Sequence, residues 1–163
     1  MKLGIIGAGN MGSSILKGVT SSNFLENKNI AIFDLNKEKI EELSKEYGIK
    51  KAENENELAK ESDILILSVK PNIIPKVLDK IKDDLSEKTI VLSIAAGISI
   101  NFIENIIGTD KKVIRTMPNT PAQVMEGMTA VSFNDNIQEN EKSMIFKLLN
   151  SFGKSIEIEE KLM

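Results

Sequence analysis

The sequence contains no cysteine, no histidine and no tryptophan in 163 residues, and aromatic residues make up only 4% of it. Without cysteine the chain can form neither a disulfide bond nor a thiolate nucleophile. Without histidine it lacks the commonest general base and a frequent zinc ligand. We therefore expect no metal site, and the lack of cysteine fits a reducing compartment.

Long apolar runs and an excess of positive charge are also absent. The formal net charge is −3, and lysine and arginine are spread along the chain, so no basic patch for nucleic acid is expected. No run is long enough for a transmembrane helix, and the apolar start of the chain is interrupted too early for a signal peptide. We expect a cytoplasmic protein that binds neither nucleic acid nor membrane. The 41% hydrophobic content suffices for one core, so residues 1–163 are expected to form a single domain.

Short apolar runs alternate with charged segments of helical spacing. The runs predict strands at 3–6, 30–33, 64–69, 90–94 and 113–114, and the spacing predicts helices at 13–21, 37–47, 57–60, 73–84 and 100–106. This alternation predicts an α/β, doubly wound, Rossmann-type sheet, mostly parallel, with helices on both faces. Additional strands at 129–133 and 155–158, with a helix at 139–152 between them, are expected to extend the sheet.

A glycine-rich segment follows the first predicted strand and opens the first predicted helix. It reads Gly7-Ala8-Gly9-Asn10-Met11-Gly12. In this pattern the first glycine permits a tight turn, the second lets the backbone approach a pyrophosphate, and the third lets the helix pack closely. The helix N-terminus adds backbone N–H donors. A glycine turn without a ligand has the same spacing, but the strand-to-helix position favours a dinucleotide clamp.

The residue that ends the second predicted strand is Asp34, about 20 residues after Gly12. A carboxylate here can accept hydrogen bonds from the adenosine ribose, which favours NAD because it repels a 2′-phosphate. Asp34 is equally suited to cap the helix that follows. Asn36 and Lys37 are close enough to bind a 2′-phosphate instead. The choice between NAD(H) and NADP(H) therefore stays open.

Two more strand ends are candidates for ligand contacts, because ligands of doubly wound sheets bind at the carboxyl ends of the strands. Ser68-Val69-Lys70-Pro71 closes one strand, and Ala95, Ala96 and Gly97 follow the next one. Lys70 is unusual directly after a buried run, although a solvated lysine at a helix start is the simpler interpretation. The three small residues would let a flat ring approach the backbone.

A proline-rich segment, Arg115-Thr116-Met117-Pro118-Asn119-Thr120-Pro121-Ala122, is followed closely by Glu126-Gly127-Met128-Thr129. Two prolines that frame Asn-Thr constrain the backbone too much for a helix and remove donors that a central strand needs. We therefore expect a rigid loop that holds side chains for chemistry.

The segments at 7–12, 69–71, 93–98 and 115–122 together resemble the pyrroline-5-carboxylate reductase family. The resemblance extends over the whole chain, and Met-Pro-Asn-Thr-Pro is its most specific element. It implies NADP(H) or NAD(H) as cofactor and 1-pyrroline-5-carboxylate, reduced to proline, as substrate. It also implies that an asparagine at the start of the short helix before Val69 touches the adenosine side; Asn54 and Asn56 are both near this position, and we choose Asn56. Three residues are expected beside the nicotinamide ring, namely Pro118, Asn119 and Thr120.

Members of that family continue into a helical domain that supplies the substrate carboxylate site and the dimer interface. The resemblance therefore implies that this chain is the cofactor-binding half of a homo-oligomeric enzyme, with little or no activity alone and no certain catalytic residue of its own. Three alternatives stay open. One is another reductase of the same broad class, such as a hydroxyacid dehydrogenase or a deazaflavin-dependent NADP reductase, and the second is a non-catalytic nucleotide-binding module. The third is a plain α/β domain in which the glycines and prolines only make turns.

Overall fold

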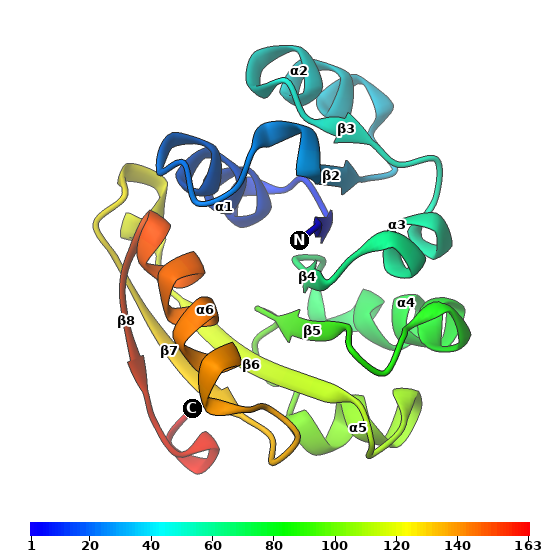
Figure 1. The fold of residues 1–163 in the computed structure, drawn as a ribbon, viewed down its shortest axis with the longest axis vertical. Helices are drawn as coiled ribbons and strands as arrows, with labels where there is room; N and C mark the ends of the chain where they lie inside the picture. The colour runs from blue at the N-terminus through cyan, green and yellow to red at the C-terminus, as the bar shows by residue number, and fades with distance from the viewer.

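The computed structural model describes residues 1–163, and its strands form one eight-stranded sheet (Figure 1). The strands are β1 (Leu3–Ile6), β2 (Ile30–Phe33), β3 (Lys50–Lys51), β4 (Ile64–Leu67), β5 (Ile90–Ser93), β6 (Lys112–Pro118), β7 (Gly127–Phe133) and β8 (Gly153–Glu157). Their order in the sheet is β3-β2-β1-β4-β5-β6-β7-β8. Every neighbouring pair is parallel except β6 and β7, which are antiparallel. The prediction of a mostly parallel, doubly wound α/β sheet is confirmed.

Six α-helices cover the two faces of the sheet. They are α1 (Asn10–Ser21), α2 (Lys37–Tyr47), α3 (Glu55–Glu61), α4 (Ile74–Ile81), α5 (Ile100–Ile107) and α6 (Glu139–Leu149). The apolar residues of α1, α2 and α6 pack into one core cluster, and those of α3, α4 and α5 into another on the opposite face. Two clusters are needed because β1, β4 and β5 are buried along their whole length, so each face must be covered.

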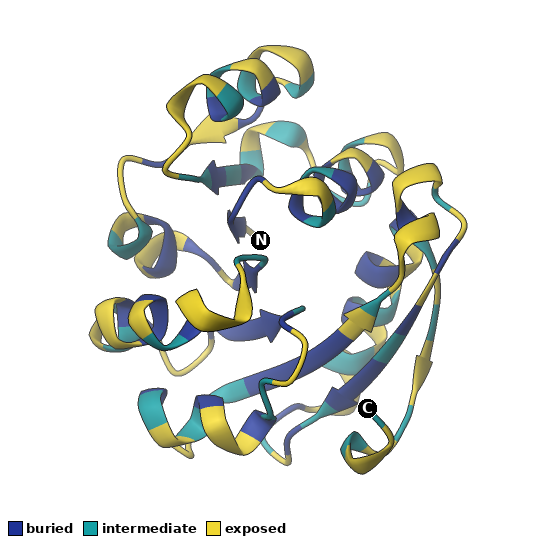
Figure 2. Cartoon of the chain, turned by 180° about the vertical axis from the view of Figure 1, so that it is seen from behind, coloured by how far each residue is buried: buried dark blue, intermediate teal, exposed yellow.

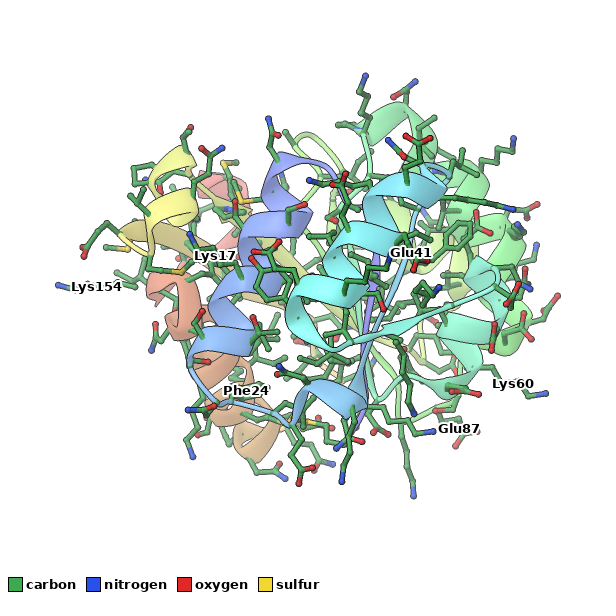
Figure 3. All side chains as sticks on the ribbon, turned by 90° about the horizontal axis from the view of Figure 1, so that it is seen from above. Lys17, Phe24, Glu41, Lys60, Glu87 and Lys154 are labelled. Carbon is green, nitrogen blue, oxygen red and sulfur yellow. The ribbon has the colours of Figure 1, made fainter.

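Burial follows this layering (Figure 2). The strands in the middle of the sheet are buried, whereas the outer faces of the helices are exposed. Seen from above, Lys60 and Lys154 extend away from opposite sides of the molecule (Figure 3). No helix has both the length and the apolar character needed to cross a membrane.

The proline-rich segment corrects one prediction. We expected a loop from Arg115 onward, but β6 continues to Pro118. Its pairing with β5 ends at Arg115, which lies opposite Ser93, whereas its pairing with β7 continues until Pro118 lies opposite Thr129. The last part of β6 is thus an edge, where a proline removes no hydrogen bond from the outer side. Only then does the chain turn, into the short 3-10 helix η4 (Thr120–Val124).

Other boundaries differ by a few residues. The first helix begins at Asn10 instead of Ser13, and the segment expected to be one helix from Ile73 divides into η2 (Pro71–Ile73), α4 and η3 (Lys82–Asp84). The two-residue strand β3 was not predicted. It consists of two exposed lysines at the edge of the sheet, and so gives no apolar pattern.

Candidate functional site

The glycine-rich segment forms the turn between β1 and α1. Gly7 adopts a φ of 104°, and its N–H donates to the carbonyl oxygen of Phe33 at 2.8 Å. Gly9 is the N-cap of α1, and no side chain caps the helix. A Cβ built on Gly9 would have no atom within 4 Å. The first N–H groups of α1 therefore face open space, as an anion site at a helix N-terminus requires.

Gly7 and Gly12, in contrast, are in very close packing. A Cβ on Gly12 would overlap the carbonyl oxygen of Gly7 and approach Ser68 Oγ to 2.5 Å. Ser68 Oγ donates to this same carbonyl oxygen at 2.6 Å, so the end of β4 is hydrogen bonded to the turn. Of the other residues of the turn, Ala8 is buried, Asn10 is exposed, and Met11 packs partly buried against the core.

Asp34 also holds the turn in place. Its Oδ2 accepts from the N–H of Ala8 at 2.6 Å, and its Oδ1 accepts from the N–H of Asn36 at 2.8 Å. The N-cap of α2 is Asn36, whose side chain accepts from the N–H of Lys39. Of the two roles expected for Asp34, helix capping thus belongs to Asn36. Lys37 is exposed at the first position of α2 and lines a small hollow with Asp34.

A cleft of about 370 Å³ opens beside the turn. The residues that line it come from the carboxyl ends of β1, β2 and β4 and from α3, η2 and α4; they are Ile6, Gly7, Gly9, Phe33, Asp34, Leu35, Glu55, Ser68, Val69, Lys70, Ile73 and Val77. Ser68, Val69 and Lys70 thus line this cleft at the carboxyl end of β4, and Pro71 follows as the first residue of η2. Leu35, one of the lining residues, is 87% exposed. An apolar wall beside a helix N-terminus suits an aromatic base attached to a phosphate.

A second hollow, of about 330 Å³, lies on the other side of the turn. It is lined by Ala8, Gly9, Asn10, Ser13, Ser14, Lys39 and Gln123. Gln123 arrives there because η4 packs against α1. The turn is therefore open to ligand from both sides, and Lys39 adds a positive charge to the second one.

The loop that follows β5 begins beside the last part of β6, because Ser93, the last residue of β5, lies opposite Arg115. Ala95 is buried and its N–H donates to Ser93 Oγ at 3.2 Å, whereas Ala96 and Gly97 are exposed, Gly97 with a φ of 75°. At the end of β6, Pro118 is half-buried and Thr120 is exposed. These loops offer exposed backbone at the carboxyl end of the sheet.

The side chain of Asn119 forms a hydrogen bond within its own loop. Its Oδ1 accepts from the N–H of Met128 at 2.9 Å and so closes the segment between β6 and β7. This contact fixes the loop geometry, and the exposed remainder of the Asn119 side chain is available for other contacts.

Asn56 does not lie with the other predicted residues. Its Nδ2 donates to the carbonyl oxygen of Lys80 at 2.7 Å and to Asp84 Oδ2 at 2.6 Å, which turns the amide toward α4 and η3. Asn54 is the N-cap of α3 and accepts from the N–H of Glu57. The side chain of this helix that lines the cleft is Glu55, which forms an ion pair with Lys80.

The sequence did not point to Leu35, Glu55, Ile73 and Val77 of the cleft, nor to Lys39 and Gln123 of the second hollow. The position of Leu35 directly after Asp34 was a usable signal, because it follows the carboxyl end of a strand. The sequence around Gln123 contains no such signal, because the position of Gln123 depends on the packing of η4 against α1.

The small hollow beside Asp34 is lined by the carboxylates of Asp34, Glu41 and Glu53 and by the lysines Lys37 and Lys51. A hydrogen bond from Lys51, together with its positive charge, lowers the pKa of Glu41, so the carboxylate of Glu41 is ionised at neutral pH. This pair lines the same small hollow as Asp34 and Lys37. Lys51 is thus paired with Glu41. The other lysine of this hollow, Lys37, lies three residues after Asp34 in the chain.

The largest hollow lies elsewhere. It measures about 790 Å³ between α5 and the ends of β7 and β8, and its lining includes the carboxylates of Glu104, Asp135, Glu157, Glu159 and Glu160. Such a surface repels a phosphate. The structure contains no cluster of three or more aspartates or glutamates arranged to hold a metal ion.

Known proteins share both the sequence and this fold. A pyrroline-5-carboxylate reductase of Escherichia coli is 36% identical over 162 residues, which are 99% of this chain and 60% of that protein. The reductase of Coxiella burnetii superposes with a TM-score of 0.93 at 28% identity, over 98% of this chain and 59% of that chain. The reductase of Plasmodium falciparum, solved with NADP bound, gives a TM-score of 0.89 at 32% identity, over 99% and 58%.

The resemblance to pyrroline-5-carboxylate reductases is thus confirmed, and the chain spans about 60% of the length of these relatives. A family model described as NADP oxidoreductase, coenzyme F420-dependent, matches residues 2–97, which include the glycine turn, Asp34 and the ends of β4 and β5. This match covers more than half of the sequence, and the chain therefore belongs to the family of coenzyme F420-dependent NADP oxidoreductases.

Proposed function

We propose that this chain is the dinucleotide-binding domain of a pyrroline-5-carboxylate reductase, an enzyme that reduces 1-pyrroline-5-carboxylate to proline with NADPH or NADH. The observation that carries the proposal is the packing on α1 of η4, the segment that follows Pro118 and Asn119, because it places Gln123 beside Ala8, Gly9 and Asn10 of the glycine turn. The family model ends at residue 97, before that segment, whereas the reductases match almost the whole chain.

The residues present fit a dinucleotide. The open space at Gly9 and the uncapped start of α1 would receive the pyrophosphate. Leu35 and Ile73 would cover the adenine, with the ribose toward Asp34. Ala95, Ala96 and Gly97 would form one wall beside the nicotinamide, and Pro118, Asn119 and Thr120 the other. The similar reductase from Plasmodium falciparum, which was solved with NADP bound, supports a dinucleotide as the ligand.

The chemistry of such an enzyme is a hydride transfer, which the reduced nicotinamide supplies to the electrophilic carbon of the imine. The protein must hold the reacting carbons about 3–3.5 Å apart, and positioning contributes most of the rate. A protonated imine is already activated, so a chain without histidine can serve the reaction. Here the rigid loop closed by Asn119 and the exposed backbone at Gly97 would orient the ring and exclude water from one face.

We propose further that residues 1–163 act as one domain and that the remaining part of the relatives' length provides the substrate carboxylate site and the homo-oligomer contact. The test is steady-state oxidation of NADPH and NADH by this chain with 1-pyrroline-5-carboxylate. We expect dinucleotide binding with negligible turnover. Turnover close to that of a full-length reductase would contradict the division of the active site. The cytoplasmic location stays a prediction.

A second candidate is favoured by the family model itself, whose description names coenzyme F420. Such a reductase would transfer a hydride between NADP and a deazaflavin. Reduction of NADP by the reduced deazaflavin, with no reaction of pyrroline-5-carboxylate even when a full-length reductase's C-terminal part is added, would select this candidate.

A further inference from the structure

One carboxylate oxygen joins three distant parts of the structure. Glu160, the first residue of the C-terminal 3-10 helix η6 (Glu160–Leu162), accepts with its Oε1 from the backbone N–H of Ile100 at 2.8 Å. The same oxygen accepts from Arg115 Nη1 at 3.1 Å. The bond to Ile100 spans 60 residues of sequence, and the bond to Arg115 spans 45. The end of the chain is thus fastened to α5 and to β6.

Both donors lie close in sequence to the loops that we assign to the nicotinamide side. Ile100 opens α5 three residues after Gly97, and Arg115 lies on β6 three residues before Pro118. Arg115 lies opposite Ser93, whose Oγ accepts from the N–H of Ala95. A shift of Arg115 would therefore move both the loop at Ala95–Gly97 and the segment that begins at Pro118.

Arg115 is buried and charged, and Glu160 is its counter-charge. The side chain of Arg115 is only 10% exposed, and its Nε is buried without a hydrogen-bond partner. A buried guanidinium that loses its counter-charge is strongly destabilised, so the strand around it would have to move toward water. At Ile100 the carboxylate also occupies the N-terminus of α5, where a negative charge is favoured by the helix dipole and by the free N–H groups.

We propose that Glu160 is a positioning residue for nicotinamide binding: through Arg115 and Ile100 it holds the two nicotinamide-side loops at the separation that the ring requires. The proposal rests on the proposed dinucleotide function. Glu160 contacts neither the glycine turn nor Leu35, so its influence should be confined to the nicotinamide half of the ligand.

The experiment compares ligands with and without the nicotinamide. Dissociation constants of NADPH and NADH are measured by nicotinamide fluorescence, and those of ADP-ribose and its 2′-phosphate by calorimetry. The chain is used as wild type, Glu160→Ala and Glu160→Gln. The matched control is Glu159→Gln, because Glu159 lies next in sequence but pairs only with exposed Lys161. Thermal unfolding checks that each variant is folded.

We expect Glu160→Ala to weaken binding of the reduced dinucleotides about three- to tenfold and to leave ADP-ribose binding within about twofold. Glu160→Gln, which keeps an acceptor oxygen for Ile100 but removes the charge that faces Arg115, should give an intermediate loss. If the alanine variant does not fold, this loss in the glutamine variant is the deciding result. Glu159→Gln should change neither affinity.

Equal weakening of both ligand classes would show a general structural role and overturn the proposal, as would unchanged affinity for the reduced dinucleotides. A wild-type chain that binds ADP-ribose or the dinucleotides keeps the proposed function, whatever the variants do. A wild type that binds none of the four ligands would overturn the proposed function, and the role of Glu160 with it.

Discussion

The carboxylate of Asp34 accepts a hydrogen bond from the backbone N–H of Ala8 at 2.6 Å, across 26 residues of sequence. The end of β2 is thereby fastened to the turn that follows β1. The second oxygen of Asp34 accepts from the N–H of Asn36, so the carboxylate is fixed between two backbone donors. This residue therefore shapes the glycine turn and also places a negative charge beside the site proposed for the ribose.

Replacement of Asp34 separates these two effects. Asp34→Ala removes the acceptor of the Ala8 N–H and should lower the free energy of unfolding by about 1–2 kcal/mol. Asp34→Asn keeps one acceptor oxygen but removes the charge, so the affinity for NADP relative to NAD should rise at least about threefold. Urea unfolding and calorimetric titrations with both dinucleotides check these outcomes. An unchanged NADP-to-NAD ratio in Asp34→Asn would show that the carboxylate does not face the 2′ position.

The glycines of the turn should differ in what they tolerate. A methyl group on Gly12 would meet the Gly7 carbonyl oxygen and Ser68 Oγ, so Gly12→Ala should destabilise the fold by about 1–3 kcal/mol. Gly9→Ala is the matched control, because its methyl group would enter open space at a φ of −67°. Urea unfolding of both variants measures the difference. Equal stability of the two variants would contradict the close packing of Gly12.

Leu35 should matter for binding and not for stability. Its side chain is 87% exposed, so Leu35→Ala should change the free energy of unfolding by no more than about 0.5 kcal/mol. If the leucine covers the adenine, the loss of its buried area should weaken dinucleotide binding about three- to tenfold. Ile156→Ala, at another exposed apolar residue that lies on β8 outside the cleft, is the control. The assignment of the adenine position fails if both variants bind like the wild type.

Lys142 should make the free energy of unfolding depend slightly on pH in the alkaline range. The hydrogen bond to Glu157, at 2.9 Å, raises the pKa of Lys142 above the ordinary 10.5, and the ammonium also lies 5.0 Å from the ring centre of Phe133. A raised pKa means that the stabilisation is complete below about pH 10 and is lost as the pH rises through the folded value. Lys142→Met should cost roughly 0.5 kcal/mol at pH 8, because the pair is partly solvated.

Urea unfolding of the wild type and Lys142→Met at pH 8 and pH 11 tests this dependence. The difference between the two proteins should shrink at the higher pH. A difference that stays constant would assign the effect to packing on Phe133 instead of to charge.

The local features of the site could be predicted from the sequence, and the features that depend on tertiary packing could not. The glycine turn and the strand ends near Asp34 and Lys70 could be predicted from short-range spacing, because the end of an apolar run marks the end of a buried strand. Ligands of such sheets bind at these strand ends. Asn56 was predicted in preference to Asn54, but the sequence does not show where this helix begins or which of its residues face the cleft. Because Asn54 caps α3, Glu55 lines the cleft and Asn56 turns toward α4.

The end of β6 shows the same limit. Two prolines indicated a loop, but the strand continues to Pro118 because it stays paired with β7, and the proline is tolerated because β5 stops pairing at Arg115. No local pattern shows how far a neighbouring strand extends. Gln123 and Glu160 likewise reach their partners through the packing of η4 on α1 and of η6 near α5, each of which brings together residues far apart in the sequence.

The turn between β1 and α1 is expected to bind a dinucleotide, and calorimetric titration of the chain with NADP and with NAD, alongside Gly9→Val, measures this binding. A valine at Gly9 fills the space left for the pyrophosphate while it meets no protein atom at its Cβ. We expect saturable heat for at least one dinucleotide with the wild type and none with folded Gly9→Val. No heat from the wild type with either dinucleotide, or equal binding by the variant, would contradict this expectation.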